Sequence, residues 1–160
     1  AKLPAVCAVT TEEFSATKGA FAARLTLSPD KVKGGKSVDV LAELTNTSSA
    51  PATITFRPEC SEIEPQVFRN GERADLVDAC ATLSGCPGKT MQIVLEPGGK
   101  LTARTSMKTV VTKHKKADCA SYVAGPLAPG EYELRVHAPL FPVKALDEAS
   151  AKLTVLKSMK

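Results

Sequence analysis

The sequence contains no tryptophan, and only 4% of its residues are aromatic. A buried tryptophan packed on an inter-sheet disulfide is a hallmark of antibody-type immunoglobulin domains, so its absence disfavours that type of domain. The core must instead be built from Val, Leu, Ile, Ala and the five Phe. With 43% apolar residues among 160, the chain has enough apolar material for one folded domain.

The signature motifs of enzymes are also missing. The sequence has no glycine-rich phosphate loop, no Gly-x-Ser-x-Gly and no His-Glu-x-x-His. Glu59, Glu62 and Glu64 lie close together, but their spacing is more typical of a solvated strand edge than of an acid/base pair. We therefore predict that the protein is not an enzyme, with no catalytic residues and no cofactor.

Long apolar runs and a strong excess of charge are absent too. No stretch approaches the ~20 apolar residues that cross a bilayer, so we predict no transmembrane segment. A net charge of +4 is too small to indicate a nucleic-acid partner. The one dense basic run, Lys-His-Lys-Lys at residues 113–116, predicts a solvated loop. Its alternatives are contact with an anionic partner and a protease-sensitive loop.

Histidine is scarce, which restricts metal chemistry. His114 and His137 are the only two, they lie far apart, and no Cys-x-x-Cys pair accompanies them, so a structural zinc site is disfavoured. A blue-copper site needs two His, one Cys and a weak Met ligand. His114, Cys119, His137 and Met107 supply these types, but without the usual tight spacing. We predict no metal site and keep copper binding as a second alternative function.

The five cysteines favour disulfides instead. Cys80 and Cys86 bracket a short loop followed by Pro87-Gly88, which a bridge could close, and Cys60 and Cys119 are paired only by elimination. Cys7 is then the odd cysteine, either a buried free thiol or half of an intermolecular bridge. Five cysteines allow many connectivities, and the sequence does not choose among them.

The cysteines and the first residue together bear on localisation. Disulfides form in oxidising compartments. The sequence begins at Ala1, a small residue of the kind found after signal-peptide cleavage, although a trimmed cytosolic Met would also leave it. We predict a secreted or periplasmic protein, or one of the cell envelope.

Period-two alternation of apolar residues is the strongest structural signal. Val38, Val40, Ala42 and Leu44 alternate with polar residues, and so do the residues after the turn at Pro129-Gly130. Asn70-Gly71 is a strong signal for a hairpin. Similar segments recur about every ten residues, which predicts an all-β fold, an Ig-like antiparallel β-sandwich of seven to nine strands. Residues 1–20 are expected to be a tail or edge segment, and residues 21–160 a single domain.

Two polar residues stand out in this pattern. Tyr132 follows the Pro-Gly turn, and we expect its hydroxyl to bond back to the backbone near that turn, as in a tyrosine corner. Asn46-Thr47-Ser48 has loop chemistry and also matches the N-glycosylation tripeptide.

Two pairs of segments carry a resemblance to a known family. The first pair is residues 38–48, a strand that ends in Leu-Thr-Asn-Thr-Ser, and residues 50–56, a Pro-bearing turn with a strand that ends in Phe56. The second pair is residues 95–99 and 127–132, each with a Pro-Gly turn. Across residues 21–138 the chain resembles the Bacillus intracellular proteinase inhibitor family and related Ig-like bacterial domains. The resemblance implies an Ig-like sandwich that binds a protein through its loops, while the cysteines and the predicted export depart from that family.

These observations favour a non-enzymatic binding or assembly module, a subunit of a cell-envelope or extracellular complex with a protein partner. Loops on a rigid scaffold carry recognition, so we expect the contacts in residues 60–65, 80–89 and 113–124. The alternative function is an Ig-like protease inhibitor. In that case the loop between Cys80 and Cys86 supplies rigidity, and a lysine of residues 113–116 enters a trypsin-like pocket.

Overall fold

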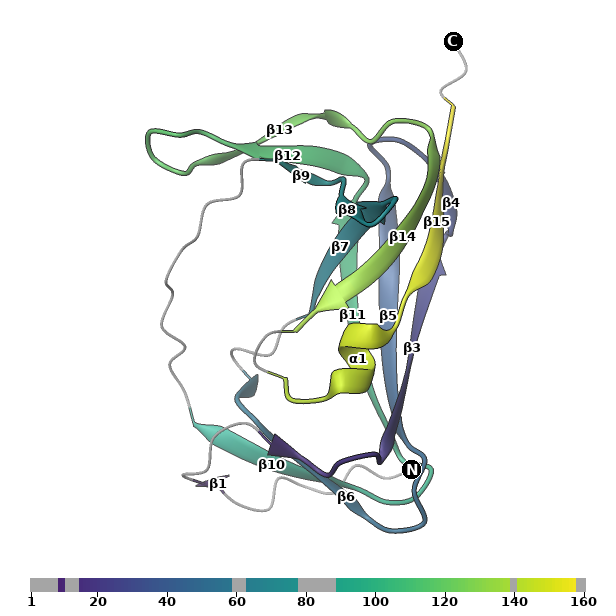
Figure 1. Ribbon diagram of the computed structural model, residues 1–160, viewed down its shortest axis with the longest axis vertical. Coiled ribbons are helices and arrows are strands. Elements are labelled where there is room, and N and C mark those ends of the chain that lie inside the picture. Colours follow the sequence, from purple (N-terminus) through teal and green to yellow (C-terminus); the bar gives the residue numbers. More distant parts are fainter. Residues whose placement is uncertain (1–8, 11–14, 59–62, 78–88, 139–140, 158–160) are drawn as a thin grey trace.

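The computed structural model describes residues 9–10, 15–58, 63–77, 89–138 and 141–157 (Figure 1). This part of the chain is mostly β-structure, with fifteen strands in four sheets and one short helix. Of the described helices, none has the length and apolar character to cross a membrane.

The sheet with the longest strands has the strand order β11-β5-β3 and is antiparallel. Its central strand buries every second residue from Val38 to Asn46, so the alternation in the sequence is the alternation of a sheet with one buried face. The cis peptide Ser28-Pro29 lies just after the first of its strands. The bounds are β3 (Phe21–Ser28), β5 (Ser37–Asn46) and β11 (Lys100–Lys108).

A second sheet faces the first and has the order β4-β15-β14-β7-β8. In its central strand β14, Tyr132, Leu134 and Val136 are buried. The β7–β8 hairpin turns at Asn70-Gly71, where both residues have positive φ, as a type I′ turn requires. The bounds are β4 (Lys31–Lys33), β7 (Glu64–Arg69), β8 (Glu72–Arg73), β14 (Gly130–His137) and β15 (Ala151–Leu156).

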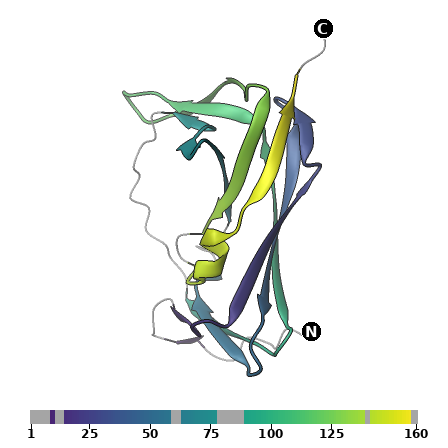
Figure 2. The same cartoon turned by 45° about the vertical axis from the view of Figure 1, so that its right-hand side comes forward.

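The main core lies between these two sheets (Figure 2). It draws buried apolar residues from β3 and β5 on one side and from β7, β14 and β15 on the other. Val38, Val67, Leu134 and Leu153 are fully buried there. Burying one such side chain contributes roughly 1.5–3 kcal/mol, so this shared core is the main force that joins the two layers.

A third sheet closes one end of the molecule with the order β1-β10-β6-β2. Together with the short helix α1 it covers a second core of Leu44, Ile54, Phe56, Leu95 and Val143. The bounds are β1 (Val9–Thr10), β2 (Ser15–Ala16), β6 (Ala52–Phe56), β10 (Thr90–Leu95) and α1 (Lys144–Glu148).

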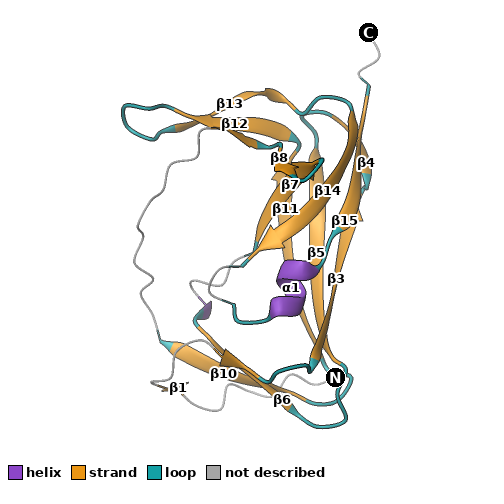
Figure 3. Cartoon of the chain, in the orientation of Figure 1, coloured by secondary structure: helices purple, strands orange, loops and turns teal. Residues whose placement is uncertain are grey.

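The fourth sheet, with the order β13-β12-β9, lies at the opposite end and projects sideways from the body (Figure 3). Its strands are β9 (Leu76–Val77), β12 (Val110–His114) and β13 (Ser121–Pro126). We call these three strands the hairpin sheet. Strands β12 and β13 form an antiparallel hairpin with a register shift between Val111 and Thr112, and β9 joins β12 in parallel.

Several predictions from sequence are confirmed and others need correction. The β class, the strand with alternating residues from Val38 to Leu44, the strand that ends in Phe56, the strand after Pro129-Gly130 and the Asn70-Gly71 hairpin are confirmed. The pairing is not purely antiparallel, because β9 with β12 and β4 with β15 are parallel. The described strands also exceed the expected seven to nine, and their division into four sheets does not by itself define an Ig-like sandwich. In the predicted tail, β1 and β2 pair at the edges of the third sheet.

Candidate functional site

The hairpin sheet gathers most of the exposed large apolar side chains in the described part of the chain. Val77, Tyr122 and Val123 are 39%, 46% and 61% exposed, and the fourth such residue, Leu156, lies on β15. Large apolar side chains are costly to leave in water, so a cluster of them on a small surface is typical of an interaction site. This cluster makes the hairpin sheet the candidate site.

The register of the strands divides these side chains between the two faces of the sheet. Lys113 is paired with Tyr122 on one side and with Val77 on the other, so these three residues form a row on one face. Val123 is paired with Thr112 and therefore lies on the other face. Ser121, Tyr122, Val123 and Ala124 are all exposed, so neither face of this part of β13 is covered.

Thr109 fixes the base of the hairpin to the body. It is fully buried between β11 and β12, and its hydroxyl donates a 2.9 Å hydrogen bond to the carbonyl of Lys36. Its carbonyl accepts bonds of 2.9 Å from the backbone N–H groups of Gly35 and Leu127. These bonds hold both strands of the hairpin against the β4–β5 turn, so the projecting sheet leaves the body from a defined point.

Asp75 attaches the third strand. Its carboxylate accepts a 3.2 Å bond from the backbone N–H of Val67 and pairs with Arg73, while its carbonyl accepts a 2.9 Å bond from the N–H of Thr112. One residue thus links β7, β8 and β12 just before β9 begins. This linkage sets the position of β9 beside β12.

The tip of the hairpin is a hydrogen-bonded turn with basic residues. The N–H of Lys115 donates to the carbonyl of Ala120, and the N–H of Cys119 donates to the carbonyl of Lys115, both at 2.9 Å. Cys119 has a positive φ of 57°. Lys115 and Lys116 are exposed, as expected for this basic run.

Among the expected contact regions, only residues 113–124 are fully described. They were expected to be an irregular loop, and this is wrong, because most of them form β12, a tight turn and β13. The other two regions, 60–65 and 80–89, lie largely outside the described residues. Tyr122, Val123 and Val77 were not singled out from sequence, although Val110-Val111-Thr112 and Tyr122-Val123 carry the β-branched and aromatic residues that favour strands.

Of the four cysteines in the predicted disulfides, Cys119 alone lies in the described part of the chain. Cys119 is exposed and disulfide-bonded. Cys7, Cys60, Cys80 and Cys86 lie outside the described residues. The pairs Cys80–Cys86 and Cys60–Cys119 therefore stay predictions.

The residues considered for copper are spread over three strands and a turn. His114 ends β12, His137 ends β14 and Met107 lies in β11. A cysteine whose sulfur is in a disulfide does not offer the thiolate that a blue-copper site uses. Within the described ranges, no group of three or more His, Cys, Asp or Glu is placed to hold a metal ion.

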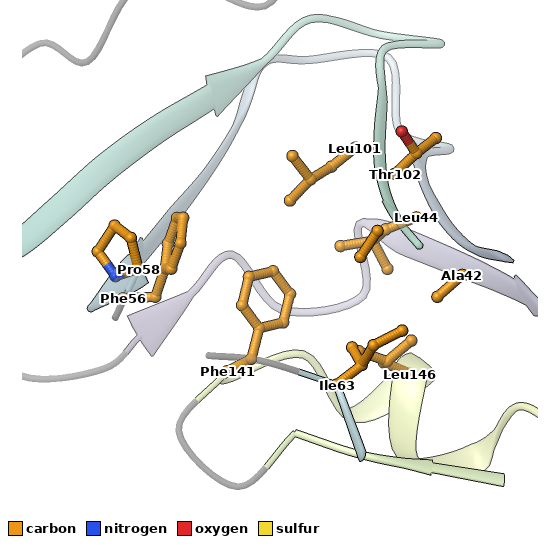
Figure 4. Close-up of a pocket in the computed structure, with 10 residues that line it drawn as sticks. Ala42, Leu44, Phe56, Pro58, Ile63, Leu101, Thr102, Phe141 and Leu146 are labelled. Carbon is orange, nitrogen blue, oxygen red and sulfur yellow. The ribbon is translucent and has the colours of Figure 1, made fainter. Parts of the chain in front are cut away.

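An apolar cavity of about 200 Å³ lies where the two cores meet (Figure 4). Its walls include Leu44, Phe56, Leu101 and Phe141, and the rings of Phe56 and Phe141 meet edge to face at 5.2 Å. Among its described lining residues, Thr102 has the one polar side chain. Small-ligand sites combine apolar walls with several convergent polar groups, which this cavity lacks among those residues.

Two shifted pKa values in the described part of the chain belong to neighbouring side chains on β14, apart from the hairpin sheet. The side-chain hydrogen bond from Arg135 lowers the pKa of Glu133, and the same bond raises the pKa of Arg135. Both side chains are exposed, so this pair is a surface interaction of small energetic weight.

Comparison with known proteins assigns no family. No family model matches the sequence, and no curated protein matches it. Among solved structures, the chain is similar to part of the alkylpurine DNA glycosylase AlkC of Pseudomonas fluorescens, with a TM-score of 0.42 and 14% identity over 86% of this chain and 31% of that one. It is also similar to part of the β-glucosidase EmGH1 of Erythrobacter marinus, with a TM-score of 0.38 and 15% identity over 89% of this chain and 16% of that one.

A β-glucosidase of Listeria innocua gives a TM-score of 0.40 and 15% identity over 88% of this chain and 16% of that one. The chain spans less than a third of the length of each of these proteins. Similarity at this level assigns neither a fold family nor an activity.

Proposed function

We propose that this chain is a non-enzymatic binding or assembly module on an Ig-like β-sandwich, exported to the cell envelope or the extracellular space. The observation that carries the proposal is the exposure of Val77, Tyr122 and Val123 on one small projecting sheet. A partner protein that covers these side chains removes their apolar surface from water, which is the main favourable term in protein association. The two facing sheets with their shared core are the rigid scaffold that such a module needs.

Two further features support the details of this proposal. The disulfide at Cys119 is typical of proteins in oxidising compartments, and so it favours export. The anchors at Thr109 and Asp75 hold the hairpin sheet in place before a partner arrives. A surface that is already ordered costs less entropy on binding.

Site-specific photo-crosslinking in the native source tests this proposal. A benzophenone side chain at position 123 is expected to give one dominant crosslinked protein, identifiable by mass spectrometry. The matched control places the same group at Leu156, which is similarly exposed at 43% but lies on β15. Equal crosslinking from both positions, or none from position 123, would contradict a binding role for the hairpin sheet.

A second candidate function, inhibition of an extracellular protease, is favoured by the tip of the hairpin. Lys115 and Lys116 are exposed in a turn held by backbone hydrogen bonds and by the disulfide at Cys119. A constrained exposed lysine suits the acidic specificity pocket of a trypsin-like protease. Titration of trypsin with the oxidised protein tests this function, and the double variant Lys115→Ala, Lys116→Ala is titrated for comparison. If the oxidised protein does not inhibit trypsin at about 1 µM, this candidate function is excluded, because specific protease inhibitors bind much more tightly than that.

A further inference from the structure

The outer edge of β13 is an unprotected strand edge. In the described part of the chain β13 is paired with β12 alone, so its other side presents unpaired backbone N–H and C=O groups. The first four residues of the strand are exposed, which leaves this edge open to solvent. Such an edge can accept another extended segment as a new strand.

Charged side chains and proline, two devices that protect edge strands, are missing from most of this one. Natural edges carry charged residues or proline that discourage pairing. Residues 121–125 read Ser-Tyr-Val-Ala-Gly, with no charge and no proline, and Pro126 comes only at the base. The bulge of the hairpin falls on β13 at Ala124, and Ser121, Tyr122 and Val123, on the tip side of it, keep a regular register with β12.

Charge around the hairpin distinguishes between possible occupants. Residues 109–126 contain three lysines and one aspartate, a net charge of +2 with the histidine neutral. Lysines stand near both ends, with Lys113, Lys115 and Lys116 toward the tip, and Lys33 and Lys36 at the base beside Thr109. Pairing of β13 with a second copy would bring lysines close to lysines in either strand direction, which opposes it. An extended segment with acidic residues flanking an apolar or β-branched centre meets no such repulsion.

We propose that β13 accepts an extended acidic segment of a partner protein as a fourth strand of the hairpin sheet. This inference rests on the proposed binding function and specifies its geometry. Backbone hydrogen bonds along β13 hold the segment, Tyr122 and Val123 contact its alternate side chains, and the lysines at the two ends attract its acidic residues.

The test uses the full disulfide-intact chain and a capped fluorescent peptide, Asp-Glu-Val-Thr-Val-Thr-Glu-Asp, as the probe. Binding is measured by fluorescence anisotropy, and the strand that binds is identified by amide hydrogen exchange. We expect saturable binding that weakens with added salt, together with slower exchange of the β13 amides. Backbone N-methylation of alternate peptide residues removes the strand hydrogen bonds and should weaken binding by about tenfold or more.

Two matched variants of the protein test whether the peptide binds at β13. Val123→Glu puts a negative charge on the exposed edge and should weaken binding of the peptide by about tenfold. Leu156→Glu makes the same change at an exposed position on β15 and should leave the affinity within about twofold. Both positions are exposed, so both variants are expected to fold, which circular dichroism verifies.

Several outcomes would overturn the proposal. These are no binding up to about 1 mM peptide, a range that covers weak recognition, equal binding of the N-methylated peptide, or equal effects of the two variants. Self-association of the chain that Val123→Glu abolishes would assign the edge to a second copy instead. If position 123 still crosslinks a native partner while the β13 amides stay unprotected by the peptide, strand addition fails and the binding function stands.

Discussion

At the residue scale, Asn46 is a polar residue whose buried side chain is hydrogen-bonded to the backbone. It is 1% exposed, and its side-chain N–H group donates to the carbonyls of Leu95 at 2.8 Å and Ala50 at 2.9 Å. Its side-chain oxygen accepts a 2.9 Å bond from the N–H of Ser48. The amide that a glycan would need is therefore engaged inside the folded protein, although the tripeptide matches the acceptor pattern.

We predict that Asn46→Ala lowers the free energy of unfolding by about 2–4 kcal/mol, because the buried carbonyl of Leu95 loses its side-chain donor and the part-buried bond to Ala50 is lost as well. Denaturant titration followed by circular dichroism measures this change. Ser48→Ala is the control, because that hydroxyl bonds the carbonyl of Ala50 in the exposed part of the loop and the side-chain oxygen of Asn46 at a part-buried position, and its loss should cost less than about 1 kcal/mol. Equal effects of the two variants would mean that the buried amide has no special role.

Tyr132 was predicted to form a tyrosine corner, and this is confirmed, because its hydroxyl donates to the carbonyl of Ala128. Its ring is buried and Arg69 lies 5.3 Å from the ring centroid. Tyr132→Phe removes the hydroxyl alone and should cost about 1 kcal/mol.

The other tyrosine of the chain, Tyr122, is its matched control. It is 46% exposed, so Tyr122→Phe is expected to leave the midpoint of thermal unfolding unchanged. A loss of stability in Tyr122→Phe as large as in Tyr132→Phe would contradict the corner.

At the scale of elements, the turn between β4 and β5 packs closely against the segment that follows the hairpin sheet. A Cβ atom placed on Gly34 would lie 2.6 Å from the carbonyl oxygen of Leu127 and 3.0 Å from the Cβ of Pro126. Backbone atoms cannot yield as a flexible side chain can. Only glycine therefore fits at this contact without a shift of the hairpin base.

We predict that Gly34→Ala destabilises the protein by about 1–3 kcal/mol through overpacking. Gly125→Ala is the control within the hairpin, because a Cβ there meets nothing within 4 Å. Thermal unfolding of both variants measures the difference. A Gly34→Ala protein as stable as the parent would show that the β4–β5 turn and the hairpin base are not in rigid contact.

The strands that could be predicted are those with one buried and one exposed face. In β5 and β14, alternation of apolar and polar residues follows directly from a core on one side. Strands β12 and β13 lack this signal, because every residue of β12 is half-buried and most of β13 is exposed. These two strands are held in place by pairing with each other and by the hydrogen bonds of Thr109 and Asp75. These bonds join residues that are distant in sequence. For the same reason the sequence indicated the region of the candidate site and missed its apolar residues.

At the scale of the whole molecule, the disulfides bear on both stability and export. We predict two bridges, Cys80–Cys86 and Cys60–Cys119, with Cys7 unpaired. Loss of a native disulfide from a small exported domain costs ~2–5 kcal/mol, so a reductant should clearly lower the melting temperature. Peptide mass mapping without reduction identifies the pairs. Five free thiols in protein from the native source would contradict the export proposal.

The central claim is that the hairpin sheet joins this chain to a partner protein. Size-exclusion chromatography with light scattering, on protein isolated gently from its native source, tests it most directly. We expect that the natural chain elutes in a complex, and that a chain with Tyr122→Ser and Val123→Ser elutes as a monomer with an unchanged melting temperature. A natural chain that elutes as a monomer at every salt concentration, or a complex that survives both substitutions, would contradict the claim.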